Sequence, residues 1–384
     1  MKNLIGICLF VIAIGSTSKA LGEIGVTDTE VIIGGHTTES GPMAGAGAGA
    51  AQGGAAYYEM INAKGGINGR KIKWIRKDTQ SLAPKTVEGV RQLVEEDKVF
   101  AVVGSSGPSH IAVVKYLNER KVPDLFFSDG AGAYADLSLK MSFPMYYTWE
   151  SEGQTVANYV VKTMKGKKAC FLQTKDTLGE EYVKGAMKVL KDVNFRVGPT
   201  IRVERMGAQA DSEVLNFKQE GCDVILTSVY GPLCSSAINY GFSQGYKPTW
   251  IISSFNVNTK FIGLLSDSVK DGVISVHNLV RERSLAKDKK AWDDYEALMK
   301  KNNIPVSGIS ATGYTLAEVF TETLRRAGKN LTREGILEAA TSFDGTWKCS
   351  LCLNPLRSSP SNHFAFGPGK LLITKNKEWT FVEN

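Results

Sequence analysis

The stretch from Glu30 to Asp78 constrains the fold of this chain more than any other. It begins with an apolar strand at residues 31–34, passes through a run of small residues, and continues with the apolar spacing of a helix. Paired glycines at residues 65–66 stop that helix, and a turn leads into a second strand at residues 71–76. This order of strand, helix and strand predicts a parallel α/β unit.

The small residues of this stretch form a Gly-Ala run at residues 44–51. We expect the run to be a loop between strand and helix, because backbone amides without bulky side chains can approach a small molecule closely. It lacks the third glycine of the dinucleotide-binding fingerprint, and the chain contains no Gly-Lys-Ser/Thr sequence. These two departures argue against a nucleotide site, and no cofactor is expected.

The alternation of strands and helices continues along the chain in two series. The first series reaches residue 127 and places Ser- and Gly-rich loops at residues 104–109 and 128–133, each directly after a strand. An aromatic stretch at residues 143–152 interrupts the pattern, a second series follows, and the tail from Trp347 onward has the pattern of turns and hairpins. We therefore predict an α/β fold of two Rossmann-like lobes with parallel doubly wound sheets. Open sheets bind ligands at the carboxyl ends of their strands, so two facing edges would form a cleft.

Residues 1–22 have the features of a secretory signal peptide. Lys2 is followed by an apolar run at residues 4–14, and small residues surround a cleavage position after Ala20. The apolar run is shorter than the ~20 residues that a membrane-spanning helix needs. Removal of residues 1–22 leaves 362 of the 384 residues. A chain of this length is too long for one ordinary core, which favours two lobes.

The chain carries 46 basic and 39 acidic residues, a formal net charge of +7. The basic residues are scattered among acids, which is typical of a solvated surface rather than of a stripe that binds nucleic acid. No nucleic-acid partner is expected. The mild positive charge could still steer an anionic ligand.

Five cysteines follow the signal segment, and an odd number leaves at least one of them unpaired within the chain. Cys170 lies in a predicted buried strand and is most simply a small core residue. Cys222 and Cys234 flank another predicted strand, whose ends are ~25 Å apart. A disulfide needs Cα atoms within ~7 Å, so we do not expect these two to bond to each other.

Cys349 and Cys352 are the one pair close in sequence. A local disulfide is our first interpretation of this pair. A zinc site would need two further ligands, of which His363 is the only nearby candidate. No metal site is therefore expected.

Motifs for catalysis are weak. The sequence Gly241-Phe242-Ser243-Gln244-Gly245 matches a nucleophile elbow, but a helix precedes it and a strand follows, which is the reverse of the required order. The four histidines are isolated in the sequence and are expected to be structural (His36, His110, His277 and His363). We do not expect an enzyme. A serine hydrolase that uses Ser243 or a serine of the 105–109 loop is a remote alternative.

Several segments together resemble a known family, the periplasmic solute-binding proteins of branched-chain amino acid ABC transporters (leucine-binding protein-like, type I periplasmic binding fold). The most specific is Ile61-Asn62 followed by Gly65-Gly66-Ile67-Asn68-Gly69. The others are Gly25-Val26-Thr27-Asp28-Thr29-Glu30, Ser40-Gly41-Pro42, Val102-Val103-Gly104, Lys121-Val122-Pro123 and Asp223-Val224-Ile225. The resemblance covers nearly all of the chain after the signal segment.

The resemblance implies two lobes that are joined by three crossovers and close on a ligand. The first lobe would hold residues 23–147 and 278–350, and the second residues 148–277 and 351–384. The family's ligand contacts fall on loops after strands, namely Ser105, Ser106, Gly107, Gly130, Ala131, Gly132 and Tyr230.

The chain departs from the family pattern at three ligand contacts, one of which is an aromatic contact near the start of the chain that falls on Ala46. The family's carboxylate that binds a ligand ammonium falls on Phe255, and a hydroxyl that helps hold the ligand carboxylate falls on Gly132. A buried ammonium without its partner costs several kcal/mol. Another acid therefore replaces that anchor, or the ligand is not an α-amino acid. The acids available for this are Glu39, Asp129, Glu150 and Asp176.

Phe255, Tyr230 and Trp149 would suit a flat apolar or aromatic solute. The sequence thus slightly favours a carboxylate that is not an amino acid, with branched-chain amino acid-like solutes and amides as alternatives. We expect a monomeric extracytoplasmic receptor that delivers a small-molecule ligand to the permease and ATPase subunits of an ABC transporter. A periplasmic ligand sensor with the same fold is the main alternative.

Overall fold

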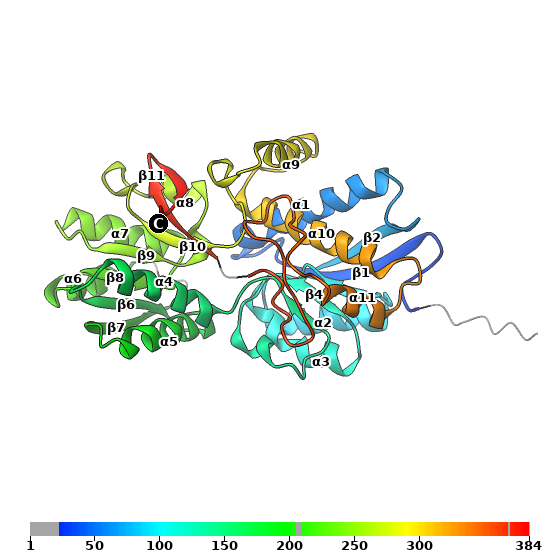
Figure 1. Ribbon diagram of the computed structural model, residues 1–384, viewed down its shortest axis with the longest axis horizontal. Coiled ribbons are helices and arrows are strands. Elements are labelled where there is room, and N and C mark those ends of the chain that lie inside the picture. The colour runs from blue at the N-terminus through cyan, green and yellow to red at the C-terminus, as the bar shows by residue number, and fades with distance from the viewer. Residues whose placement is uncertain (1–22, 205–206, 208, 368, 384) are drawn as a thin grey trace, which may run out of the picture.

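The computed structural model describes residues 23–204, 207, 209–367 and 369–383 (Figure 1). The expected signal peptide, residues 1–22, lies outside the described residues. None of the described helices combines the length and the apolar character that crossing a membrane requires.

The first sheet has five strands in the order β2-β1-β3-β4-β5, and every pairing in it is parallel. Its strands are β1 (Glu30–Thr37), β2 (Lys71–Asp78), β3 (Ala101–Val103), β4 (Asp124–Phe127) and β5 (Ser142–Pro144). β3 and β4 are buried along their whole length. Continuous burial is typical of parallel strands with helices on both faces of the sheet.

The second sheet has seven strands in the order β12-β11-β10-β9-β8-β6-β7. Its strands are β6 (Ala169–Thr174), β7 (Val197–Val203), β8 (Val224–Thr227), β9 (Thr249–Ile252), β10 (Ile274–His277), β11 (Lys370–Lys375) and β12 (Glu378–Phe381). The strands from β6 to β10 pair in parallel, whereas the hairpin β11–β12 joins β10 in the antiparallel sense. Figure 1 shows the two sheets in opposite halves of the molecule. The expected α/β class with mostly parallel sheets is confirmed.

Helices follow the strands of both sheets. Those of the first half are α1 (Ala44–Ala63), α2 (Ala83–Glu95), α3 (Val114–Glu119), α9 (Lys289–Lys301), α10 (Gly308–Ala327) and α11 (Arg333–Ala340). Those of the second half are α4 (Trp149–Thr163), α5 (Thr177–Asp192), α6 (Asp211–Gln219), α7 (Pro232–Ser243) and α8 (Thr259–Leu264). Side-chain caps begin several of them, as at Asp176, whose carboxylate accepts the amide of Gly179 at 2.9 Å.

The chain passes between the two halves after β5, after β10 and before β11. The last passage was expected at residues 350–351, but residues 351–366 contact the first half. Ser358 Oγ donates to the carbonyl of Ala340 at 2.7 Å, and His363 Nδ1 lies 3.1 Å from the carbonyl oxygen of Ser142. We therefore propose that the first lobe continues to about residue 367 and that the second regains only the β11–β12 hairpin.

The Gly-Ala run at residues 44–51, expected as a loop, forms the first turns of α1 instead. Its continuation packs closely against α10. A Cβ atom on Gly53 would lie 2.2 Å from the carbonyl oxygen of Ser310, and one on Gly313 would lie 1.8 Å from that of Ala50. The small residues therefore allow two helix backbones to approach each other, and this packing outweighs the low helix propensity of glycine.

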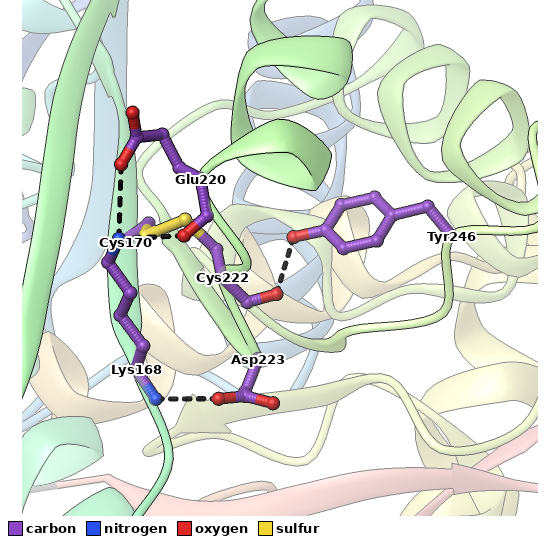
Figure 2. Close-up of a disulfide and its surroundings, with 6 residues drawn as sticks. All are labelled: Lys168, Cys170, Glu220, Cys222, Asp223 and Tyr246. Atoms are coloured by element: carbon purple, nitrogen blue, oxygen red, sulfur yellow. Dashed lines mark hydrogen bonds and ion pairs between the residues drawn. A yellow bond between two sulfur atoms is a disulfide. The ribbon is translucent and has the colours of Figure 1, made fainter.

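Cys170 is bonded to Cys222, which corrects the expectation that Cys170 is simply a core residue (Figure 2). Their Cα atoms lie 5.9 Å apart although 52 positions separate them in sequence. β6 and β8 are neighbours in the sheet, with Ala169 opposite Val224, so the amino-terminal ends of both strands meet. The strand lengths considered in the sequence analysis could not reveal this neighbourhood.

Polar contacts surround this disulfide at the sheet edge opposite the carboxyl ends of the strands. As Figure 2 shows, Tyr246 donates its hydroxyl to the carbonyl of Cys222 at 2.7 Å. The backbone amide of Lys168 donates to Asp223 at 2.8 Å, and its ammonium donates to the carboxylate of Glu220 at 3.1 Å.

Among the other described cysteines, the local disulfide that was our first interpretation is present, and one thiol is free. Cys349 and Cys352 are bonded to each other, with Cα atoms 5.1 Å apart. Cys234 is a buried free thiol, and burial raises its pKa.

Candidate functional site

A cavity of about 420 Å³ lies between the two halves. Its lining comes from segments that directly follow strands of both sheets, where the carboxyl ends of parallel strands meet. The first half contributes Thr38, Met43, Gly47, Ser81, Ser106, Gly107, Pro108, Ile111, Ser128, Asp129, Ala131 and Ala133. The second half contributes Trp149, Asp176, Thr177, Leu178, Tyr230 and Phe255.

Six of the nine residues expected to bind ligand line this cavity, namely Ser106, Gly107, Ala131, Trp149, Tyr230 and Phe255. The other three contact protein groups beside it. Ser105 is buried, and its hydroxyl accepts the amide of His36 at 3.3 Å. The carbonyl of Gly130 accepts the amide of Trp149 at 2.9 Å. The amide of Gly132 donates to Glu181 of α5, at 3.0 Å to Oε1 and 2.8 Å to Oε2.

Aromatic side chains form the wall of the cavity on the side of the second half. The ring of Phe255 lies 5.4 Å from that of Trp149 and 5.5 Å from that of Tyr230, measured between centroids. Tyr146 packs behind Trp149 at 5.6 Å. Such rings offer a large, rigid apolar surface to a flat solute.

The loop that carries Phe255 is held by a buried carboxylate that the sequence analysis did not identify. Glu152 of α4 is fully buried, and its two oxygens accept the amide and the hydroxyl of Ser254, each at 2.8 Å. Burial raises the pKa of Glu152 to about 7. The loop after β8, which carries Tyr230, is tied to the same segment, because Asn256 Oδ1 accepts the amide of Gly231 at 2.8 Å.

The opposite wall offers hydroxyl groups. Thr38 Oγ1 and Ser81 Oγ share a hydrogen bond of 2.7 Å. Ser106 Oγ is buried and has no hydrogen-bond partner among the described residues, so it is available to a ligand. Gly107 has φ +102°, and a Cβ there would lie 2.5 Å from Ser81 Oγ, so only glycine fits between the two loops.

The four acids considered as replacement anchors separate into two groups. Glu39 is paired with Arg76 at 2.9 Å and Glu150 with Lys184 at 2.7 Å, and neither is among the described lining residues. Asp129 and Asp176 do line the cavity. Burial raises the pKa of Asp129, whose Oδ1 accepts the amide of Ala131 at 3.0 Å.

Two of the histidines that are isolated in the sequence meet in space. His36 Nε2 lies 2.8 Å from His110 Nδ1, and His110 Nε2 lies 2.9 Å from Asp124 Oδ2, all of them buried. This chain of groups lies behind the loop that carries Ser105. Within the described part of the chain, no three His, Cys, Asp or Glu side chains gather closely enough to hold a metal ion.

Comparison with known proteins agrees with this architecture. A family model described as "Periplasmic binding protein" matches residues 30–371. An amino acid binding protein of Pseudomonas aeruginosa is 30% identical over 152 residues, which cover 39% of this chain and 41% of that protein, less than half its length. Leu/Ile/Val-binding protein homolog 7 of Brucella abortus is 23% identical over 322 residues, 79% of each chain.

Solved structures share the fold at low sequence identity. A branched chain amino acid ABC transporter protein from Thermus thermophilus with bound valine has a TM-score of 0.81 and 16% identity, covering 94% of this chain and 96% of that one. A fatty acid ABC transporter substrate-binding protein from Thermomonospora curvata has a TM-score of 0.78 and 20% identity, covering 94% and 93%. With two facing α/β halves, a cavity between them and a family match over nearly the whole described chain, this protein belongs to the periplasmic binding protein family.

Proposed function

We propose that this protein is the extracytoplasmic substrate-binding component of an ABC transporter. It captures a small organic solute in the cavity between its halves and closes around it. A solute that contacts both halves stabilises the closed arrangement over the open one, because it binds the two states with different affinity.

One observation carries this proposal: the cavity is lined by loops from both sheets, with hydroxyls on one side and an aromatic wall on the other. Closure is needed to complete such a site. A hydrogen bond from Gly132 of the first half to Glu181 of the second already spans the two halves beside the cavity. The names of the similar proteins, which refer to amino acids and fatty acids, support a small solute with an apolar body.

The same proposal covers location and partners. The protein would be exported by its amino-terminal signal, act as a monomer, and hand its solute to a membrane permease that is driven by an ATPase. The family supports an extracytoplasmic location. A sensor of the same fold would bind its solute equally well, and it would be distinguished by its partner rather than by its cavity.

A binding role without catalysis is part of the proposal. Ser243, the candidate nucleophile, is the last residue of α7, and its hydroxyl donates to the carbonyl of Tyr240 at 2.7 Å. It therefore sits at a helix end that precedes a strand, opposite to the strand-to-helix turn that a nucleophile elbow needs.

Ligand binding and closure can be tested together. We would screen branched-chain amino acids, amides, aromatic acids and amines by thermal unfolding, and then record X-ray scattering with each hit at saturation. A hit should reduce the radius of gyration. Saturation at about 100 times the dissociation constant should add about 2.7 kcal/mol to the free energy of unfolding.

Variants locate the binding site. Trp149→Ala and Phe255→Ala should each weaken binding of a hit at least about tenfold, because each removes buried aromatic surface from the solute. Tyr159→Ala, on the same helix as Trp149 but outside the cavity lining, should leave affinity within about twofold. Binding without compaction, or equal loss in all three variants, would contradict the proposal.

A further inference from the structure

The charge of the solute can be inferred from the groups that face it, if the proposed function holds. The loop after β4 is where amides would be expected to receive a ligand carboxylate. In the structure these amides already serve protein carboxylates. Gly132 donates to both oxygens of Glu181, and Ala131 donates to Asp129 at 3.0 Å.

The loop after β3 is similarly engaged. The amide of Ser106 donates to the carbonyl of His36 at 3.1 Å, as part of the pairing between neighbouring strand ends. An incoming carboxylate would therefore compete with existing acceptors for the amides of Ser106, Ala131 and Gly132.

Among the described residues that line the cavity, the charged ones are the carboxylates Asp129 and Asp176. Asp176 is already engaged with the protein, because it accepts hydrogen bonds from Thr174 Oγ1 and from the amide of Gly179, both at 2.9 Å. Glu181 is held by the amide of Gly132, whose neighbours Ala131 and Ala133 line the cavity. No Lys or Arg is among the described residues that line the cavity. The positive charge of Lys184 lowers the pKa of Glu181, but Lys184 is itself paired with Glu150 at 2.7 Å.

Glu181 and Asp129 also influence each other. Glu181 is half-buried, and desolvation together with the charge of Asp129 raises its pKa. A ligand carboxylate placed in this cavity would add a further negative charge at low dielectric, which costs more than its remaining hydrogen bonds would return. A positive charge would relieve the repulsion.

The aromatic wall suits the same ligand. Trp149, Tyr230 and Phe255 lie together where the second half lines the cavity. Ring faces attract cations as well as apolar groups. Apolar and cationic parts of one molecule can therefore both be accommodated.

We propose that the cleft selects an organic amine, a protonated amino group on a flat or branched apolar body, and that Glu181 excludes carboxylates by occupying the amide of Gly132. This deepens the proposed function and differs from the carboxylate that the sequence favoured. In this account Asp129 faces the cation, and Glu181 sets specificity without touching the solute.

A matched charge series tests the proposal. Phenethylamine, phenylacetamide and phenylacetate share one ring and differ in charge, and isopentylamine, isovaleramide and isovalerate repeat the comparison on a branched body. Isothermal titration of the wild-type protein at neutral pH and low salt should rank amine above amide above acid in at least one series. We expect the amine to bind at least about tenfold more tightly than the acid.

The variant Glu181→Gln keeps an oxygen for the amide of Gly132 but removes the charge. It should reduce the ratio of amine to acid affinity at least about fivefold. The matched control is Glu180→Gln, the neighbouring exposed residue of α5 that pairs with Arg202, and it should leave the ratio unchanged.

Tighter binding of the acid than of the amine in both series, no binding of either amine, or the same ratio in wild type and Glu181→Gln would overturn the inference. If acids bind and compact the protein, only the charge inference fails and the proposed function stands. If no solute of any charge in the wider screen causes compaction, the proposed function itself fails.

Discussion

At the scale of single residues, a buried carboxylate shapes the candidate site from behind. Glu152 does not line the cavity, but it holds the backbone and hydroxyl of Ser254, and Phe255 follows directly. The carboxylate is fully buried and has no cationic partner at hydrogen-bond distance among the described residues, so its ionised form is costly to the folded state.

This predicts a distinctive pH dependence. The pKa of Glu152 is about 7 in the folded protein and lies near 4.5 when the chain is unfolded. The folded state therefore binds more protons between these values, and this group's contribution to the free energy of unfolding falls as pH rises from about 4.5 to 7. Glu152→Gln should abolish that fall, by an amount of order 1–3 kcal/mol.

Urea denaturation at several pH values from acidic to mildly alkaline would measure the difference between wild type and Glu152→Gln. Glu150→Gln, a partly exposed neighbour on the same helix that pairs with Lys184, is the control and should follow the wild-type profile. Parallel profiles for wild type and Glu152→Gln would show that Glu152 does not titrate in this range.

The two disulfides also make a residue-scale prediction. Cys170–Cys222 closes a separation of 52 residues and Cys349–Cys352 one of 3. Restricting the unfolded chain stabilises more when the closed loop is longer. Replacing Cys170 and Cys222 by Ala should lower the free energy of unfolding by about 2–4 kcal/mol, and replacing Cys349 and Cys352 by less than about 2. Urea denaturation of both double variants checks the order, and a larger loss for the short loop would contradict it.

At the scale of elements, the contact between α1 and α10 explains why the chain contains its Gly-Ala run. Gly53 and Gly313 meet the backbone of the opposite helix, with no space for a methyl group. Because protein interiors are close-packed, an added methyl group here would displace the neighbouring helix rather than fill an empty space. The two helices belong to segments more than 200 residues apart in sequence, so their contact ties the amino-terminal part of the first half to its carboxyl-terminal part.

Gly53→Ala and Gly313→Ala should each lower the free energy of unfolding by about 1–3 kcal/mol, because a Cβ would force the helix axes apart. Gly45→Ala is the matched control on α1, since a Cβ there meets nothing within 4 Å. It should be neutral or stabilise by up to about 1 kcal/mol through helix propensity. Equal effects of all three substitutions in urea denaturation would mean that propensity, not packing, controls these positions.

At the scale of the whole molecule, the cavity belongs to neither half alone. A bound solute should therefore protect backbone amides on both sides. Hydrogen–deuterium exchange with a saturating solute should slow at residues 105–108 and 128–133 of the first half, and at residues 176–178 and 229–231 of the second. The turn between β11 and β12 lies away from these loops in sequence and sheet order, and should be unchanged. Protection on one side only would show that the solute binds without closing the halves.

Much of the fold could be predicted from the sequence because it is encoded locally. The strands expected at residues 31–34 and 71–76 are found as β1 and β2, and the helix between them, α1, ends just before the paired glycines that were expected to stop it. Apolar periodicity and glycine stops operate over one element at a time. β5 and α8, with three and six residues, were missed because such short segments show little periodicity.

The sequence by itself determined the order of strands and helices, the division into two sheets and the loops that carry Ser106, Gly107, Ala131 and Tyr230. Those properties follow from local pattern and from the rule that ligand loops follow parallel strands. Only the tertiary structure decided that Cys170 bonds to Cys222, that the Gly-Ala run is a helix, and that carboxylates occupy the amides of Ala131 and Gly132. Except for the Asp129–Ala131 hydrogen bond, each of these features depends on groups that are far apart in the chain. Periodicity and motifs describe neighbours in sequence, so they do not predict which distant segments come into contact.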